Sequence, residues 1–290
     1  MVGTSKGQTM RLLVTGGEGQ VGRAFSRQTH DHELLACSRS ELNILDPDSI
    51  SVAIEKYRPD VIINCGALTN VDMCEVNPDL AISTNGHAVG LLAEQIESCG
   101  ASLVQISTDY VFDGKKEGSY LETDWTNPIS VYGHSKLLGE QLAGSNALII
   151  RTSWVMSLDG NNILVRILRL LNEDNELRFV DDQIGCPTFT DDLANTIMKL
   201  IESQISGIVH VTNSGSTSWF DFTQQVAEYI GCDPGKVLPV SQNDLNQAAQ
   251  RPANSVLENR RLVDLGFPEL PHYLDSLDHL LSKEKRADHD

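Results

Sequence analysis

Residues 11–22 read Arg11-Leu-Leu-Val-Thr-Gly-Gly-Glu-Gly-Gln-Val-Gly22, a short apolar run that passes directly into a glycine-rich turn. The glycines satisfy two spacings at once, Gly17-x-Gly19-x-x-Gly22 and Gly16-x-x-Gly19-x-x-Gly22. Between a strand and a helix, such a turn lets backbone amides meet the pyrophosphate of a dinucleotide, because glycine permits close approach. A tight turn without a ligand is the alternative. The context favours dinucleotide binding, and the predicted contacts are Gly16, Gly19, Gln20, Val21 and Gly22.

Outward from this turn, short apolar runs alternate with helical patterns, as βαβ units require. Strands are predicted at 11–15, 33–37, 60–65, 102–107 and 147–151, later joined by 177–180 and 207–212. Helices are predicted at 20–29, 47–58, 77–99, 129–143, 160–173 and 190–203. The runs are continuously apolar, which indicates strands buried on both faces. The sequence therefore predicts an α/β fold, a Rossmann-type doubly wound parallel sheet.

The pattern changes along the chain in a way that predicts two unequal parts. Residues 10–153 are expected to form a dinucleotide-binding domain, with 207–213 completing its sheet. Residues 154–206 and 214–282 are expected to form mainly a smaller C-terminal α/β substrate-binding lobe, with returns to the first domain. In this lobe we predict two helices, near 218–230 and 271–282, and a loop-like stretch at 232–270. The polar ends 1–9 and 283–290 are predicted to be disordered.

Composition and charge restrict the class of protein. The chain has 290 residues, 40% of them hydrophobic, and can bury a substantial core without staples. No apolar run approaches the roughly 20 residues that span a bilayer, and the polar start lacks a signal peptide's apolar segment, so we expect no membrane partner and a cytoplasmic location. A formal charge of -18 disfavours nucleic acid as a partner. The six cysteines show no paired metal spacing and are interpreted as reduced thiols.

A second motif supplies chemistry. Tyr132 and Lys136 lie four residues apart in a predicted helix, so both side chains can project from one face. A phenol has an unperturbed pKa of about 10, and a nearby cation lowers it, which makes Tyr132 a plausible acid. Thr108 closes the fourth strand at the carboxyl edge of the sheet, where its hydroxyl could polarise a carbonyl. Each pattern alone is weak, but their order after a nucleotide-binding turn predicts a nicotinamide-dependent carbonyl reductase.

The end of the second strand bears on the choice of coenzyme. It reads Cys37-Ser38-Arg39, without an acidic residue for a ribose 2′-hydroxyl, while Arg39 could pair with a 2′-phosphate. We therefore predict that the chain uses NADPH rather than NADH. NADH stays an alternative, since Arg39 could equally be a solvated loop residue. Asn43 and Ile44 are expected to flank the adenine. The loop after the third strand, which passes the cofactor, contributes Ala67, Leu68 and Thr69.

These residues resemble the extended short-chain dehydrogenase/reductases and, among them, the dTDP-4-dehydrorhamnose reductase family. The resemblance runs almost from end to end. It is carried by residues 15–22, 106–114, 131–136, 151–154, 180–188, 215–219 and 251–255. It implies NADPH-dependent reduction of the C4 ketone of a small dTDP-sugar, dTDP-6-deoxy-L-lyxo-4-hexulose, to dTDP-L-rhamnose, the last step of dTDP-rhamnose biosynthesis.

The resemblance also implies roles for individual residues. Tyr132 would donate the proton, Lys136 would lower its pKa and hold the nicotinamide ribose, and Thr108 would orient the ketone. Asp109 and Trp154 would line the sugar pocket, although Trp154 could instead fill the core. The last two implied contacts, to the nucleotide and its diphosphate, are Gln183 and Arg251, and a surface ion pair is an equal alternative for the arginine.

Several alternatives stay open at the level of sequence. The chain could be another sugar-nucleotide reductase or an epimerase on the same scaffold. It could also be a non-catalytic regulatory subunit like the β subunit of methionine adenosyltransferase. Some relatives form metal-linked dimers, but no full set of carboxylate ligands can be located, which leaves Mg2+ and the choice of monomer or homodimer unassigned. Asn43 stands where the family is expected to carry an aspartate, and Met73 and Cys74 where relatives more often show lysine and alanine.

Overall fold

The computed structural model describes residues 9–28, 31–173 and 175–287, with side chains as far as 282. The helices are α1 (Gln20–Arg27), α2 (Pro47–Tyr57), α3 (Val71–Val76), α4 (Pro78–Ile82), α5 (Ala88–Cys99), α6 (Val131–Leu142), α7 (Ile163–Leu171), α8 (Thr190–Glu202), α9 (Trp219–Ile230), α10 (Arg260–Asp264) and α11 (Tyr273–Ala287). The strands are β1 (Arg11–Thr15), β2 (Glu33–Ala36), β3 (Val61–Asn64), β4 (Ser102–Thr108), β5 (Leu148–Thr152), β6 (Val155–Met156), β7 (Leu177–Val180), β8 (Ile184–Gly185), β9 (Thr188–Phe189), β10 (Gly207–His210), β11 (Asn213–Ser214), β12 (Thr217–Ser218), β13 (Val237–Val240) and β14 (Leu270–His272).

The central sheet has six strands in the order β10-β5-β4-β3-β1-β2, and all its pairings are parallel. The chain starts at β1, adds β2 on one side, and then crosses over to continue with β3 on the other. In such sheets ligands bind outside the carboxyl ends of the strands, where the order reverses. The predicted doubly wound parallel sheet is confirmed, and its switch point lies between β1 and β3.

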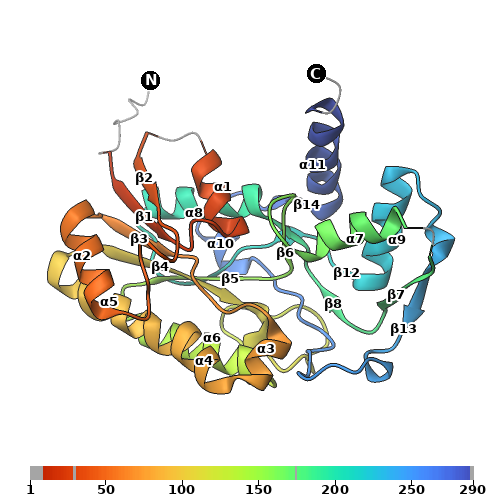
Figure 1. Cartoon of the computed structure of the whole chain (residues 1–290), viewed down its shortest axis with the longest axis horizontal. Helices are drawn as coiled ribbons and strands as arrows, with labels where there is room; N and C mark the ends of the chain where they lie inside the picture. The colour runs from red at the N-terminus through yellow and green to blue at the C-terminus, as the bar shows by residue number, and fades with distance from the viewer. Residues whose placement is uncertain (1–8, 29–30, 174, 288–290) are drawn as a thin grey trace.

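Helices cover both faces of this sheet, and the strand residues alternate between two cores. Leu12 and Val14 pack into one core with α1 and α8, while Leu13 packs into the other with α2 and α5. Figure 1 shows these two layers above and below the strands. Because both faces are covered, the strands read as continuous apolar runs, which is why the sequence located them to within one or two residues.

A third core lies mainly in the lobe at the right of Figure 1 and includes residues of α7, α9, α11, β7 and β13. Phe222 on α9 is fully buried there, packed with Leu164 of α7 and Leu277 of α11. β7 pairs in parallel with β13, away from the central sheet. The lobe therefore has a hydrophobic core separate from the two that flank the sheet.

Four local expectations need correction. The stretch 232–270, predicted to be loop-like, contains β13 and α10. The single helix predicted at 77–99 is α4, a π-helical turn at Ser83–His87, and α5, while α3 precedes it without having been predicted. α11 continues to Ala287, whereas disorder was predicted from 283. Residues 1–8 and 288–290, also predicted to be disordered, lie outside the described residues.

No helix in the described part of the chain is both long and apolar enough to cross a membrane.

Candidate active site

A cavity of about 850 Å³ opens at the carboxyl edge of the sheet and extends toward the lobe. It is lined by residues at the ends of β1, β3, β4 and β5, by residues of α1, α6 and α7, and by β7. Fourteen of the predicted site residues line it: Gly16, Gly19, Gln20, Val21, Gly22, Ala67, Thr69, Thr108, Asp109, Tyr132, Lys136, Trp154, Gln183 and Arg251. Four do not line it, namely Arg39, Asn43, Ile44 and Leu68.

The glycine turn after β1 has no room for side chains. A Cβ on Gly22 would lie 2.5 Å from the carbonyl oxygen of Gly16, which itself has a φ of +63°. α1 begins at N-cap Gly19 with no side chain capping its first amides. Uncapped amides at a helix N-terminus bind anions. The turn therefore fits the pyrophosphate of a dinucleotide coenzyme.

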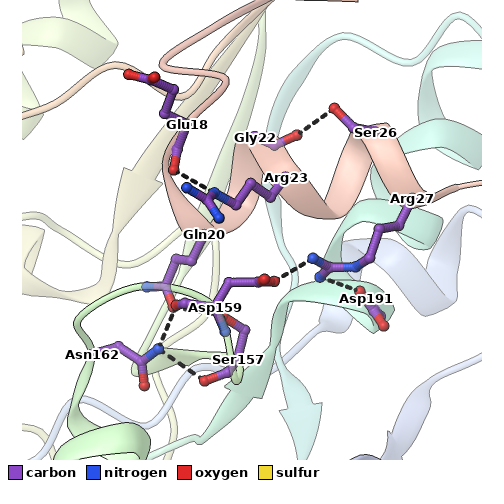
Figure 2. Close-up of polar contacts among 10 residues, drawn as sticks. All are labelled: Glu18, Gln20, Gly22, Arg23, Ser26, Arg27, Ser157, Asp159, Asn162 and Asp191. Atoms are coloured by element: carbon purple, nitrogen blue, oxygen red, sulfur yellow. Dashed lines mark hydrogen bonds and ion pairs between the residues drawn. The ribbon is translucent and has the colours of Figure 1, made fainter. Parts of the chain in front are cut away.

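A second segment, residues 157–162, is held beside this turn by ion pairs and hydrogen bonds (Figure 2). Arg27 at the end of α1 forms ion pairs with Asp159 and, at 2.9 Å, with Asp191 of α8. Asn162, which caps α7, donates to the carbonyl oxygen of Ser157 at 2.8 Å. The side chain of Gln20 donates to the carbonyl oxygen of Val155 at 3.1 Å. α1 thus holds the chain that leaves β5 and β6 against the edge of the cavity.

α6 approaches the end of β4 unusually closely. A Cβ on Gly133 would lie 2.2 Å from the carbonyl oxygen of Tyr110, so only glycine allows this contact. The helix starts at N-cap Ser130, whose hydroxyl accepts from the amide of Gly133 at 3.2 Å. The carboxylate of Glu75 accepts from the amide of Val131 at 3.1 Å. These contacts fix the first turn of α6, which carries Tyr132, against the strand end.

Tyr132 and Thr108 meet inside the cavity. Burial raises the pKa of Tyr132 above its ordinary value, and a hydrogen bond with the hydroxyl of Thr108 partly offsets this effect. The sequence predicts the opposite sign, a pKa lowered by Lys136. In the structure the buried phenol keeps its proton at neutral pH, which is the state that a proton donor needs.

Lys136 lies one turn further along α6 and is buried. Its Nζ donates to the carbonyl oxygen of Ile106 at 2.5 Å. Burial lowers the pKa of Lys136 to about 8, against the effect of the carboxylate of Glu140, which raises it. Thr108, Tyr132 and Lys136 therefore converge at one end of the cavity.

Asp109 adds a buried carboxyl group to the same wall. Its Oδ1 accepts from the hydroxyl of Thr108 at 2.9 Å, while its Oδ2 has no hydrogen-bond partner among the described residues. Burial raises the pKa of Asp109 to about 6, opposed by the hydroxyls of Ser255 and Thr108. A buried oxygen without a partner at a cavity wall is suited to a ligand hydroxyl.

Trp154 closes the cavity toward the lobe. It stacks on Trp219 with ring centroids 3.6 Å apart, and both tryptophans line the cavity. Its backbone has a φ of +45°, and its ring lies where a Cβ on Gly185 would be 2.4 Å away. The ring is half-buried, so it packs as part of the wall and also presents a surface to the cavity.

Known proteins are similar to this chain over most of its length. Residues 10–286 match a family model described as RmlD substrate binding domain. The chain belongs to the RmlD family. It is 38% identical to the spore coat polysaccharide biosynthesis protein SpsK of Bacillus subtilis, over 96% of this chain and 99% of that protein. It is 36% identical to dTDP-4-dehydrorhamnose reductase of Burkholderia thailandensis, over 91% and 95%.

A solved structure of an RmlD-type enzyme is also similar. The dTDP-4-dehydrorhamnose reductase from Bacillus anthracis, solved in complex with NADP, superposes with a TM-score of 0.92 at 34% identity. The match covers 95% of this chain and 100% of that one.

Cationic side chains lie toward the lobe of this RmlD family member. Arg251 is paired through both guanidinium NH2 groups with Asp72 of α3, at 2.9 and 2.7 Å. Arg166 and Arg178 also line the cavity, are exposed, and form no ion pair within the described part of the chain. Neither arginine is predicted from the sequence, since an arginine in an amphipathic helix or short strand belongs to no motif. Gln183 is buried and donates to Gln242 at 3.2 Å.

The end of β2, where the sequence predicts the choice of coenzyme, also holds an acid, Glu41, that was not predicted as a site residue. Arg39 is exposed after β2. The carboxylate of Glu41 folds back and accepts from both the amide and the hydroxyl of Ser38, each at 2.8 Å. Ile44 is buried against Gly66, and Asn43 accepts from the amide of Leu45 at 3.2 Å. The predicted roles of these residues toward an adenosine stay predictions.

Asn85 was also missed. It lies in the π-helical turn and is buried. Its Oδ1 accepts from the amide of Leu68 at 2.8 Å, and its Nδ2 donates to the carbonyl oxygen of Leu68 and the hydroxyl of Ser135, both at 3.0 Å. One amide thus joins the loop after β3 to α6. The signal for it was the run Ser83-Thr-Asn-Gly-His87, which interrupts the apolar helical pattern.

Among the described residues, no group of three or more His, Cys, Asp or Glu side chains is arranged to hold a metal ion.

Proposed function

We propose that this chain uses NADPH to reduce the C4 ketone of dTDP-4-dehydrorhamnose, giving dTDP-L-rhamnose. The observation that carries the proposal is that Thr108, Tyr132 and Lys136 line one cavity, which also receives the uncapped start of α1. Membership of the RmlD family and the names of its relatives support the substrate class.

The proposed chemistry divides between two hydroxyl groups and one coenzyme. Bound NADPH would supply a hydride to C4 of the sugar. Tyr132 donates its proton to the ketone oxygen, so that the carbonyl becomes a secondary alcohol. With substrate bound, the hydroxyl of Thr108 would turn from Oδ1 of Asp109 to the same oxygen, and its hydrogen bond would stabilise the negative charge that develops there. Lys136 supplies a positive charge beneath the phenol, held by the carbonyl oxygen of Ile106.

The residues that would hold the coenzyme follow the carboxyl ends of β1, β2 and β3. The amides of Gly19, Gln20, Val21 and Gly22 would bind the pyrophosphate, and Ala67 and Thr69 would lie along the nicotinamide half. The cavity admits these contacts because the glycine turn has no side chains to fill it. A relative solved with NADP supports the phosphorylated coenzyme.

Arg39 and Glu41 make the coenzyme preference testable. Arg39 would pair with the 2′-phosphate, whereas the carboxylate of Glu41 would repel it. We expect Arg39→Ala to raise KM for NADPH about tenfold and to leave KM for NADH unchanged, while Glu41→Gln lowers KM for NADPH. Steady-state rates with both coenzymes check this. Equal effects of Arg39→Ala on the two coenzymes would remove the arginine from the 2′-phosphate site.

Residues 10–153 would bind the coenzyme, and the lobe, residues 154–206 and 214–282, would supply most of the substrate contacts. The free oxygen of Asp109 and the stacked ring of Trp154 would contact the sugar. Arg166 and Arg178 are free to meet a diphosphate, whereas Arg251 must first exchange its ion pair with Asp72. Gln183 would meet the nucleotide.

The proposed function is tested by following NADPH oxidation with dTDP-, UDP- and GDP-linked 4-keto-6-deoxy sugars. Only the dTDP compounds should respond strongly, and the product of the L-lyxo compound should be dTDP-L-rhamnose by NMR. Epimerisation without net NADPH consumption would point to an epimerase. Activity on no ketone, combined with stimulation of a methionine adenosyltransferase, would identify a regulatory subunit.

A further inference from the structure

Glu140 is a buried acid that the reaction as described does not use. It lies on α6 one turn beyond Lys136 and two turns beyond Tyr132, so the three side chains share one face of the helix. Only 7% of Glu140 is exposed. A carboxylate is almost never buried unless it is paired, and the partners of Glu140 therefore indicate why it is there.

Those partners come from two neighbouring strands. Oε1 of Glu140 accepts from the hydroxyl of Ser107 at 2.5 Å and from Nε of Arg151 at 2.9 Å, and Oε2 accepts from the same guanidinium at 2.7 Å. Ser107 directly precedes Thr108 on β4, and Arg151 precedes Thr152 on β5. One carboxylate thus joins the helix that carries Tyr132 to the strand that carries Thr108.

The charges around Lys136 come from three elements. Glu140 lies on its own helix, Cys65 follows β3, and Cys74 is on α3. Both thiols have a pKa raised by burial, Cys65 to about 12 and Cys74 to about 11, so both are neutral near pH 8. Tyr132 is neutral for the same reason. Glu140, held in its ion pair with Arg151, is therefore the acidic neighbour that favours the ammonium form of Lys136.

We propose that Glu140 is a positioning residue, which holds α6 at the distance from β4 at which Thr108 meets Tyr132 and keeps Lys136 in its charged form. This inference rests on the proposed reductase function only for its effect on turnover. The effect on Lys136 belongs to the chain itself and needs no ligand.

Two substitutions distinguish the effect of Glu140 on the charge of Lys136 from its effect on the position of α6. Glu140→Gln keeps the shape and removes the charge, and Glu140→Asp keeps the charge and shortens the reach. The ammonium of Lys136 is titrated by NMR in protein carrying isotopically labelled lysine, without coenzyme or substrate. In Glu140→Gln we expect Lys136 to lose its proton about one pH unit or more lower than in the parent. The alkaline limb of kcat/KM should move the same way.

Glu140→Asp should leave the titration of Lys136 near that of the parent and lower kcat about tenfold, with KM for NADPH unchanged, since the reacting groups are displaced and the coenzyme site is not. Ser107→Ala should behave like Glu140→Asp, because it cuts the link to β4 and alters no charge. Glu97→Gln, an exposed acid on α5, is the matched control and should change neither readout.

Removing one charge of a buried pair can prevent folding. If Glu140→Gln does not fold, Glu140→Gln with Arg151→Gln removes both charges, and the same shift of Lys136 is expected. If Lys136 loses its proton at the same pH as in the parent, in folded Glu140→Gln or in the folded double variant, then Glu140 does not keep Lys136 charged. If kcat is unchanged in both Glu140→Asp and Ser107→Ala, then Glu140 does not position α6. If the pH at which Lys136 titrates shifts as expected but the chain reduces no ketone, the proposed function is wrong, whereas the effect of Glu140 on the charge of Lys136 is confirmed.

Discussion

At the scale of single residues, burial decides the protonation of the groups in the cavity. The same loss of water raises the pKa of the phenol of Tyr132, raises that of the carboxyl of Asp109 to about 6, and lowers that of the ammonium of Lys136 to about 8. In each case burial shifts the pKa toward the neutral form. At neutral pH the phenol of Tyr132 therefore keeps its proton, as a proton donor to a ketone must.

Tyr132→Phe removes the proposed proton donor and leaves the ring in place. We expect turnover to fall by about 10²–10⁴, because that is the usual contribution of a general acid. Binding of NADPH, measured by fluorescence titration, should stay within about threefold of the parent, since the glycine turn is untouched. Turnover near the parent level would show that another group delivers the proton.

Asp109→Asn tests the buried carboxyl group through stability. The folded-state pKa of about 6 lies above the ordinary 3.8, so the folded protein binds this proton more tightly than the unfolded chain. The contribution of Asp109 to stability is therefore fully present below about pH 4 and is lost as the pH rises through 6. At pH 7 the variant should be more stable than the parent by about 2–3 kcal/mol, the equivalent of about two pKa units.

Urea unfolding of parent and variant from pH 4 to 8 measures this difference. It should be near zero at the acid end and should grow as the pH rises. A constant difference across that range would mean that Asp109 does not titrate in it. If Asp109 binds the sugar, turnover of the variant should fall. The buried carboxyl would then lower stability but be required for activity.

At the scale of elements, two glycines in neighbouring helices have opposite surroundings. A Cβ on Gly133 of α6 would press on the backbone of Tyr110 at 2.2 Å, whereas a Cβ on Gly90 of α5 would meet only Leu142 at an ordinary 3.5 Å. The contact at Gly133 is where α6 approaches the end of β4. The distance between Tyr132 and Thr108 depends on this contact.

Gly133→Ala should therefore lower the free energy of unfolding by about 1–3 kcal/mol, the usual cost of overpacking. Its effect on turnover should be larger, about 10²-fold, because displacement of α6 by about 1 Å misplaces the proton donor. Gly90→Ala is the matched control and should be neutral or more stable by up to about 1 kcal/mol, since alanine favours helix. Denaturant unfolding and kcat give both readouts. Equal behaviour of the two variants would refute the close-contact argument.

At the scale of the whole molecule, the net charge of -18 acts against compactness. Apart from the buried pair of Glu140 and Arg151, most ion pairs among the described residues join exposed side chains and contribute little. Self-repulsion should consequently outweigh surface pairing, and the anionic ligand must be attracted by local cations rather than by the overall field.

Added salt should therefore stabilise the fold. Between about 0.01 and 0.15 M the screening length falls from roughly 30 to 8 Å, which weakens repulsion between distant carboxylates. We expect the thermal midpoint to rise over this range, equally in NaCl and KCl, because screening depends on ionic strength. A falling midpoint would show that attractive pairs dominate the surface.

Prediction from the sequence succeeded where a signal is local. A few neighbouring residues are enough to identify each strand of the central sheet, the glycine turn, and the pair Tyr132 and Lys136. It failed where pairing across the chain decides. Residues 237–240 contain a proline and are a strand only because β7 lies beside them. The helix predicted at 77–99 is interrupted by a π-helical turn that places Asn85 against the loop after β3.

A Rossmann-type sheet, a dinucleotide turn and a phenol with an amine one helical turn away can all be read from the residues alone, because periodicity and glycine spacing act over neighbouring positions. Which groups meet depends on how the chain folds: Thr108 with Tyr132, Glu140 with Arg151, Asp72 with Arg251. The tertiary structure also reversed the expected pKa of the phenol. Burial and long-range pairing set charge states, and neither is encoded by spacing along the chain.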